Sequence, residues 1–291
     1  MTYQRHEFNT DFTWQGARSP LSYITPAQAR DWDELGFFVL ENVVDQATRD
    51  ALTDAIAPFE KAGEEFLRSR GGRVFIARAD EITFTTNLAL NSAVIRDFVT
   101  GPIFQGVCLD LIGPDARLYW DMAVYKKPGT TEPFPWHQDN GYTYVDPQQY
   151  VTCWVALSDA TVENGCPVVA PRAHRQGTFA HKLTKLGFVC AEEDPADALT
   201  VPVKAGSVVV FSSLAPHRTG PNLSSDVRKA LINVEIKRAL KGVATVQQDC
   251  MLILKFELSN EARLTRVTAI RFASNRDRFG VRVQIVGMQN R

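Results

Sequence analysis

The sequence predicts a mainly β protein with flanking helices, arranged as a sandwich or barrel with a helical N-terminal region. Two observations support this. From residue 116 onward, short apolar segments alternate with clusters of Pro, Gly, Asn and Asp, which is the pattern of strands joined by turns. Before residue 116, apolar residues recur mostly at helical spacing. Strands and helices do not alternate regularly, so a parallel α/β sheet is disfavoured.

The N-terminal region begins with an aperiodic arm over residues 1–24, which we expect to lie on the body of the protein. Thr25 and Pro26 are a suitable N-cap and first residue for a helix ending at Gly36. A short buried strand, Phe37–Leu40, should follow. Asp45 could cap a second helix, and residues 92–112 are predicted to be helical up to Gly113-Pro114.

The second part of the chain should supply the β core. Candidate strands are 117–126, 135–139, 150–157, 167–170, 201–203, 207–212 and 229–237. Apolar residues also alternate near the end of the chain, at Leu252, Leu254 and Phe256, and again at Val281, Val283 and Ile285. We expect one domain over 1–291, with helices and outer strands in 1–115 and the β core in 116–240. The sequence leaves the fold of 241–291 open.

Composition narrows the function classes. A formal charge of −1 over 291 residues gives no reason to expect a nucleic acid or an anionic membrane as partner. The N-terminus has no apolar signal-peptide core, and no apolar run is long enough for a membrane helix. Five scattered cysteines without a Cys-x-x-Cys argue against a disulfide framework or a zinc knuckle. We expect a cytoplasmic protein with reduced thiols that acts on a small molecule.

The segment His137-Gln138-Asp139 carries the first chemical signal. On a strand, His137 and Asp139 would point to the same face. Two histidines and one carboxylate form the facial iron site that leaves coordination positions open. His217, just beyond the apolar segment 207–211, is the best third ligand. His6, His174 and His181 are poorer candidates, because they fall in the arm or in a basic loop.

Arg228 follows His217 after the turn Gly220-Pro221-Asn222. A return strand could bring it near the histidine. A buried arginine needs an anion, and its planar guanidinium matches a carboxylate, so a dicarboxylate co-substrate would suit it. The alternative is an exposed arginine within Asp226–Lys229.

Together, Trp136–Asp139, Asn164–Pro171 with His174, and His217 with Arg228 resemble the phytanoyl-CoA dioxygenase family over roughly residues 30 to 235. The resemblance implies a double-stranded β-helix, a jelly-roll or cupin-like barrel. It also implies an Fe(II)- and 2-oxoglutarate-dependent dioxygenase that uses O2 to hydroxylate an unactivated C–H bond, with release of succinate and CO2. One departure is Ala173 before His174, where the family often has Gly-Ser-His. We interpret this position as structural.

Carried over by position, the resemblance assigns iron to His137, Asp139 and His217. Arg228 would bind the distal carboxylate of 2-oxoglutarate, with help from Thr219, and Trp154 would line the co-substrate pocket. Related halogenases have a small residue where this chain has Asp139, so oxygenation is favoured over halogenation.

Three points stay open at the sequence level. Phe75, Phe84, Tyr142 and Tyr144 are candidate walls of the substrate pocket, although each could simply be packed in the core. A non-oxidative cupin-like metalloenzyme would use the three ligands but have no need of Arg228. A catalytically silent ligand-binding barrel would form no succinate from 2-oxoglutarate.

Overall fold

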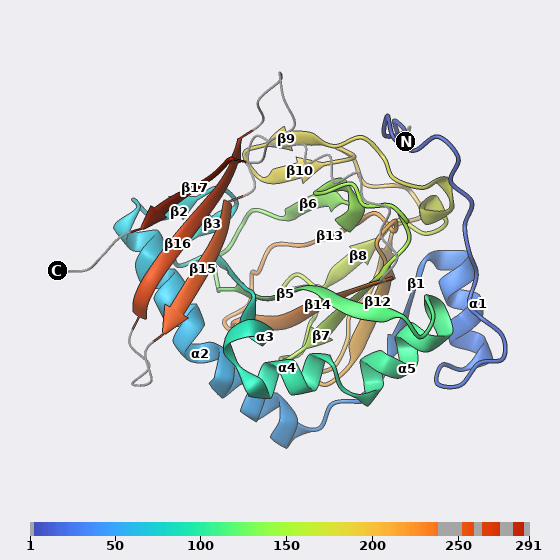
Figure 1. Cartoon of the computed structure of the whole chain (residues 1–291), viewed down its shortest axis with the longest axis horizontal. Coiled ribbons are helices and arrows are strands. Elements are labelled where there is room, and N and C mark those ends of the chain that lie inside the picture. Colours follow the sequence, from blue (N-terminus) through green and yellow to red (C-terminus); the bar gives the residue numbers. More distant parts are fainter. Residues whose placement is uncertain (1–2, 238–251, 259–263, 274–281, 288–291) are drawn as a thin grey trace.

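The computed structural model describes residues 3–237, 252–258, 264–273 and 282–287 (Figure 1). Its helices are α1 (Pro26–Leu35), α2 (Gln46–Ser69), α3 (Leu88–Asn91), α4 (Ala93–Val99), α5 (Pro102–Leu111) and the 3-10 turns η1 (Asp139–Gly141) and η2 (Ala173–Gln176). Its strands are β1 (Phe37–Leu40), β2 (Arg73–Val74), β3 (Ala77–Arg78), β4 (Ile82–Thr86), β5 (Ala116–Lys126), β6 (Phe134–His137), β7 (Val151–Ala156), β8 (Pro167–Val169), β9 (Lys182–Thr184), β10 (Gly187–Val189), β11 (Leu199–Thr200), β12 (Val208–Ser212), β13 (His217–Thr219), β14 (Arg228–Lys237), β15 (Leu252–Leu258), β16 (Leu264–Ala273) and β17 (Arg282–Gly287).

Local sequence explains the helix ends. Thr25 accepts a hydrogen bond from the backbone of Gln28 and completes a capping box, while Gly36 ends α1 in the left-handed region at a φ of 84°. Asp45 caps α2 through the Thr48 amide. These predictions are confirmed. The single helix expected over 92–112 is instead two helices, because Gly101-Pro102 ends α4 and opens α5.

Two antiparallel sheets form the body. The larger has the order β1-β12-β7-β14-β5-β4-β3-β2 and the smaller β11-β8-β13-β6. The expected jelly-roll is confirmed. Among the described residues, however, the two sheets stay separate and do not close into a barrel. A third sheet, β15-β16-β17, lies beside β4 (Figure 1). Of the residues that alternate near the end of the sequence, Leu252, Leu254 and Phe256 lie on β15 and Val283 and Ile285 lie on β17, whereas Val281 falls outside the described residues.

The central strands β7 and β12 of the larger sheet are buried at every residue, which agrees with their mainly apolar sequences. On β7, Val151, Cys153 and Val155 belong to the core cluster that also contains most of the buried hydrophobic residues of α2, α4 and α5. The alternate residues Thr152 and Trp154 face the cavity between the sheets. The helices thus support the larger sheet from outside, and its inner face is left to build a site.

The N-terminal arm lies on the body, as expected. Arg5 forms an isolated antiparallel β-bridge with Phe179. The Asn9 side chain donates hydrogen bonds to the carbonyls of Gln176 and Thr178. No helix in the described ranges is both long and apolar enough to cross a membrane.

Candidate active site

The three predicted metal ligands meet at the edge of the smaller sheet. His137 ends β6 and is the register partner of His217, the first residue of β13. Asp139 opens the turn η1. One ligand atom from each residue lies within 4.8 Å of the others, with the Asp139 Oδ1 at 3.8 Å from His137 Nε2 and 3.9 Å from His217 Nε2. The strand expected over 135–139 ends early, so a turn rather than strand alternation brings Asp139 to the two histidines.

Backbone carbonyls orient both imidazoles. His137 Nδ1 lies 2.9 Å from the Pro135 carbonyl, and His217 Nδ1 lies 3.0 Å from the Ala215 carbonyl. With Nδ1–H donating to these carbonyls, each Nε2 lone pair is free to bind a cation. Phe211 stacks on the His217 ring at 4.7 Å. Burial, with His217 nearby, holds the pKa of His137 well below its usual range, which favours the neutral form that a metal ligand needs.

The carboxylate is held as well. Thr152 Oγ1 donates to the Asp139 Oδ2 at 2.5 Å and leaves Oδ1 facing the histidines. Between the ligands, the fully buried Gln138 donates to the carbonyls of Gly177 and Leu214 and accepts from the Phe179 amide. Two imidazole nitrogens and one carboxylate oxygen on one side of a small space fit a facial iron(II) site with open positions.

Arg228 begins β14 and is 1% exposed. Its Nη1 donates to the Gly165 carbonyl at 3.2 Å, and its Cζ lies 5.4 Å from the centre of the Trp154 ring. Its Nε has no hydrogen-bond partner in the part of the chain that the structure describes. Burial lowers the pKa of Arg228 to about 10. A buried guanidinium with an unsatisfied donor, lining the same cavity as the three ligands, fits a bound carboxylate.

Sequence reasoning missed Lys126. It is the register partner of Arg228 across β5 and β14 and is 0% exposed. Its Nζ donates to Thr219 Oγ1 at 3.2 Å and to the Gly220 carbonyl at 2.5 Å. Burial first, and Arg228 second, hold the pKa of Lys126 well below its usual range. In sequence, Lys126 followed by Lys127 looks like the solvated end of a strand, so only the register reveals it.

Gly165 allows this end of the site to close. It adopts a φ of +82°, and a side chain there would lie 2.3 Å from the Gly220 carbonyl. The backbone at Gly165 and Gly220, whose carbonyls accept hydrogen bonds from Arg228 and Lys126, can therefore approach this closely only because residue 165 is glycine.

A cavity of about 250 Å³ lies between the two sheets, next to the three ligands. Phe75, Phe84, Tyr142 and Trp154, all predicted from the sequence, line it together with Thr219. Phe75 lies in the turn between β2 and β3 at a φ of 53°, a conformation that costs an ordinary residue about 1 kcal/mol or more. The strained turn places its ring at the cavity wall.

Tyr144 is not among the residues that line this cavity, which corrects the expectation from the sequence. Its hydroxyl donates to the Phe8 carbonyl at 2.7 Å, and its ring stacks on His6 at 4.8 Å. Tyr144 therefore anchors the N-terminal arm. Thr143, one residue earlier, lines the cavity instead.

The other histidines have structural surroundings. His174 is fully buried, packs edge-on against Trp14 and lies within hydrogen-bonding distance of the Asp33 carbonyl. His181 Nε2 accepts the Gln138 backbone amide at 2.9 Å, directly behind the ligand segment. Burial lowers the pKa of each ring to about 4.

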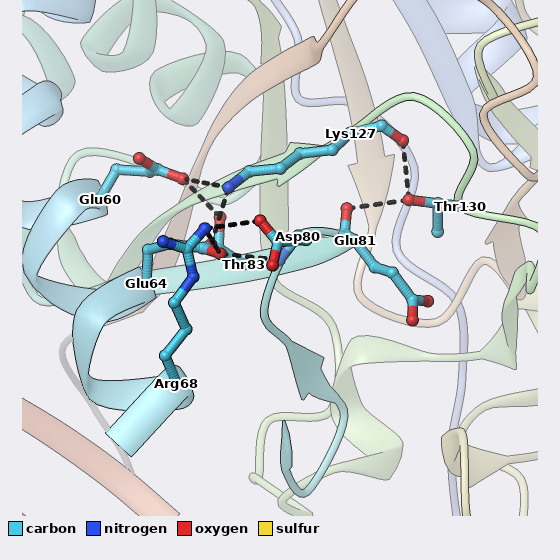
Figure 2. Close-up of polar contacts among 8 residues, drawn as sticks. All are labelled: Glu60, Glu64, Arg68, Asp80, Glu81, Thr83, Lys127 and Thr130. Carbon is cyan, nitrogen blue, oxygen red and sulfur yellow. Dashed lines mark hydrogen bonds and ion pairs between the residues drawn. The ribbon is translucent and has the colours of Figure 1, made fainter. Parts of the chain in front are cut away.

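A polar cluster joins α2 to the wall of the cavity (Figure 2). Lys127 Nζ lies 2.7 Å from Glu64 and 3.4 Å from Glu60, and Arg68 contacts Asp80 at 2.6 Å. Asp80 lies between β3 and β4, so these ion pairs attach the segment carrying Phe75 and Phe84 to α2. Whereas Lys126 is buried beside Arg228 and Thr219, its neighbour Lys127 points toward α2.

The chain is similar to known proteins in both sequence and fold. A family model described as phytanoyl-CoA dioxygenase matches residues 32–230. The methylphosphonate hydroxylase of Gimesia maris is 30% identical over 219 residues, covering 72% of this chain and 79% of that protein. Phytanoyl-CoA dioxygenase 1 of Oryza sativa subsp. japonica is 25% identical over 249 residues, covering 73% and 89%. The crystal structure of EvdO2 from Micromonospora carbonacea in complex with 2-oxoglutarate has a TM-score of 0.59 at 23% identity, covering 78% and 96%.

Proposed function

Because the chain belongs to the phytanoyl-CoA dioxygenase family and is an iron(II)- and 2-oxoglutarate-dependent dioxygenase, we propose that its reaction takes place at His137, Asp139 and His217. In this proposal the three residues hold iron(II). Arg228 and Thr219 bind the distal carboxylate of 2-oxoglutarate, and Trp154 packs beside it. The observation that carries the proposal is the buried, incompletely satisfied Arg228 in the same cavity as the three ligand atoms.

With iron, 2-oxoglutarate and O2 bound, the centre couples formation of succinate and CO2 to oxidation of a C–H bond. The residues of this chain orient the metal ligands and keep water away from the reacting atoms. The Pro135 and Ala215 carbonyls fix the imidazoles, Thr152 fixes the carboxylate, and the apolar walls exclude water from the reacting atoms. We propose hydroxylation as the outcome, since the acidic ligand Asp139 fills the position that a halide would need.

The proposed substrate is a small organic molecule that enters the cavity beside Phe75, Phe84 and Tyr142. A binding test with methylphosphonate, the compound in the name of the Gimesia maris relative, would show whether the two proteins share a substrate class. We also propose a cytoplasmic location. Its support is that Cys108, Cys153, Cys166 and Cys190 are all unpaired, as expected in a reducing compartment.

Anaerobic titration of the purified protein with iron(II) and 2-oxoglutarate tests the site. We expect one iron to bind, and 2-oxoglutarate to bind only weakly unless iron is present. Asp139→Asn should weaken iron binding strongly, whereas Asp194→Asn, a surface change, should not. Binding of iron and 2-oxoglutarate by a His137→Ala, His217→Ala double variant would contradict the assignment.

A further inference from the structure

Resting on the proposed function, we infer that the organic substrate is an uncharged and largely apolar molecule, without a phosphonate, phosphate or carboxylate group. The substrate would bind in the part of the cavity that iron and 2-oxoglutarate leave free. Three properties of the described residues support this substrate class: the chemistry of the walls, the charge of the loaded centre, and the pairing of the surrounding cations.

The remaining walls are aliphatic and aromatic. They come from the turn between β2 and β3, from β4 and β5, and from the inner face of β14. These walls include Phe75, Ile76, Phe84, Val124, Ile232 and Val234. Thr and Tyr side chains add hydroxyl groups that can hydrogen-bond to a neutral oxygen or nitrogen atom of the substrate. Burying apolar surface against such walls contributes about 25 cal/mol per Å².

The charges of the loaded centre balance. Among the described residues that line the cavity, Arg228 is the one Lys or Arg and Asp139 the one carboxylate. Iron(II) brings two positive charges and Arg228 one, while Asp139 brings one negative charge and 2-oxoglutarate two. Among these cavity-lining groups, no net positive charge then remains to attract an anionic substrate. Lys126 does not line the cavity, and its Nζ donates to Thr219 and Gly220. An unpaired anion in a dry pocket is costly.

Cations near the wall are already engaged. Arg78 pairs with Glu81 at 2.6 Å and with Glu132 at 3.1 Å. Arg73 donates to the carbonyls of Phe75 and Lys185.

The two lysines at the end of β5 are engaged as well. Lys126 donates to Thr219 and Gly220, and Lys127 pairs with Glu60 and Glu64. A phosphonate would have to break an ion pair to gain Arg78 or Lys127 as a counter-ion, and it would have to displace neutral partners to gain Arg73 or Lys126. The chain therefore differs in substrate class from a relative whose name specifies methylphosphonate, although the two share 30% identity.

The test measures how closely small probes approach the metal. The enzyme is loaded with iron(II) and 2-oxoglutarate under anaerobic conditions, and the paramagnetic relaxation of probe protons is recorded by NMR. The zinc(II)-loaded enzyme serves as the diamagnetic control. Neutral probes are indole, 4-ethylphenol and cyclohexanol. Their anionic counterparts are indole-3-carboxylate, benzylphosphonate and cyclohexanecarboxylate, with methylphosphonate added.

We expect each neutral probe to relax at least about tenfold more than its anionic counterpart at equal concentration, because the anion lacks a partner. Equal or stronger relaxation of methylphosphonate or another anion would overturn the inference. So would an absence of relaxation for every neutral probe while iron and 2-oxoglutarate bind normally. Failure of iron and 2-oxoglutarate to bind would instead overturn the proposed function, so the two failures are distinguishable.

A pair of variants checks that charge is the cause. Met122 lines the cavity from β5 and is only half-buried, so its long side chain can be replaced by a lysine of similar length. Met122→Lys should raise the relaxation of the anionic probes by about tenfold, whereas Met122→Leu should leave the preference for neutral probes intact. An unchanged ranking in both variants would show that the apolar walls, and not charge, exclude the anions, and would overturn the electrostatic part of the inference.

Discussion

Arg228 and Lys126 face each other across the antiparallel pair of β14 and β5, and both side chains are buried, at 1% and 0% exposure. No carboxylate among the described residues pairs with either of them; the contacts they make are to the Gly165 and Gly220 carbonyls and the Thr219 hydroxyl. Burial and the neighbouring guanidinium oppose a positive charge on Lys126, which is why its pKa is held well below the usual range. A carboxylate bound at Arg228 would supply a negative charge that the described residues lack, which supports the proposal that the distal carboxylate of 2-oxoglutarate binds there.

Replacing Arg228 by Met should abolish most of the affinity for 2-oxoglutarate. The distal carboxylate would lose a buried, charge-assisted partner, an effect typically worth about 2–5 kcal/mol. We expect the KM for 2-oxoglutarate to rise by about 30-fold or more, measured by succinate release with a fixed substrate. Arg218→Met is the matched control, because Arg218 pairs with Asp194 near the surface. A similar KM in both variants would remove Arg228 from the co-substrate site.

Lys126 should act as a positioning residue through Thr219. By donating to Thr219 Oγ1, the ammonium leaves the threonine hydroxyl proton to point at the carboxylate. Lys126→Met should therefore raise the KM for 2-oxoglutarate by about 3- to 10-fold and leave kcat nearly unchanged.

The neighbouring Lys127 provides the control for this effect. Lys127→Met removes the ion pairs with α2 and should lower thermal stability without changing the KM for 2-oxoglutarate. If the two variants lower stability alike and neither changes KM, Lys126 is only a structural residue.

These two lysines also show what the sequence could and could not reveal. Both ends of α1 and the start of α2 were predictable because Thr25, Gly36 and Asp45 act on their own neighbours in the chain. The side of the sheet to which Lys126 and Lys127 each point depends on the register of β5 against β14. A single sequence does not specify that register. The place of Tyr144 likewise depends on an arm 136 residues away, through its hydrogen bond to Phe8.

The metal ligands were predictable for a different reason. The three side chains carry chemistry that few other roles require, and a family resemblance linked His137 to His217 across 80 residues of sequence separation. The strand geometry assumed for Asp139 was wrong, since it lies in η1. The chemical pattern was therefore more informative than the local structure inferred around it.

Thr152 should control how tightly iron is held. Its hydroxyl satisfies the Asp139 Oδ2, so Thr152→Val would leave that oxygen without its donor and free the carboxylate to rotate. We expect the dissociation constant for iron(II), measured by anaerobic equilibrium dialysis, to rise by about 10- to 100-fold. Thr152→Ser keeps the hydroxyl and should bind iron nearly as tightly as the parent. Equal losses in both variants would point to cavity packing rather than the hydrogen bond.

Glu235 should make stability depend on pH. Its side chain is 5% exposed, and Asn233 Nδ2, at 3.3 Å, is the partner it has among the described residues. Burial raises the pKa of Glu235 from its ordinary 4.5 to about 7. The protonated form is thus the one that the fold prefers. Its contribution to stability is complete below pH 4.5 and is lost as the pH rises through 7.

Glu235→Gln tests this directly, because glutamine keeps the shape of the protonated side chain and cannot ionise. We expect the free energy of unfolding, measured by urea denaturation, to differ little between variant and parent at pH 4.5. At pH 8 the variant should be more stable by up to about 3 kcal/mol, the equivalent of the shift in pKa from 4.5 to about 7. Asp115→Asn, a change in an exposed turn, should show no such divergence. If the parent and Glu235→Gln keep a constant difference from pH 4.5 to pH 8, Glu235 is ionised within the fold, and a cation not seen among its described contacts must hold it.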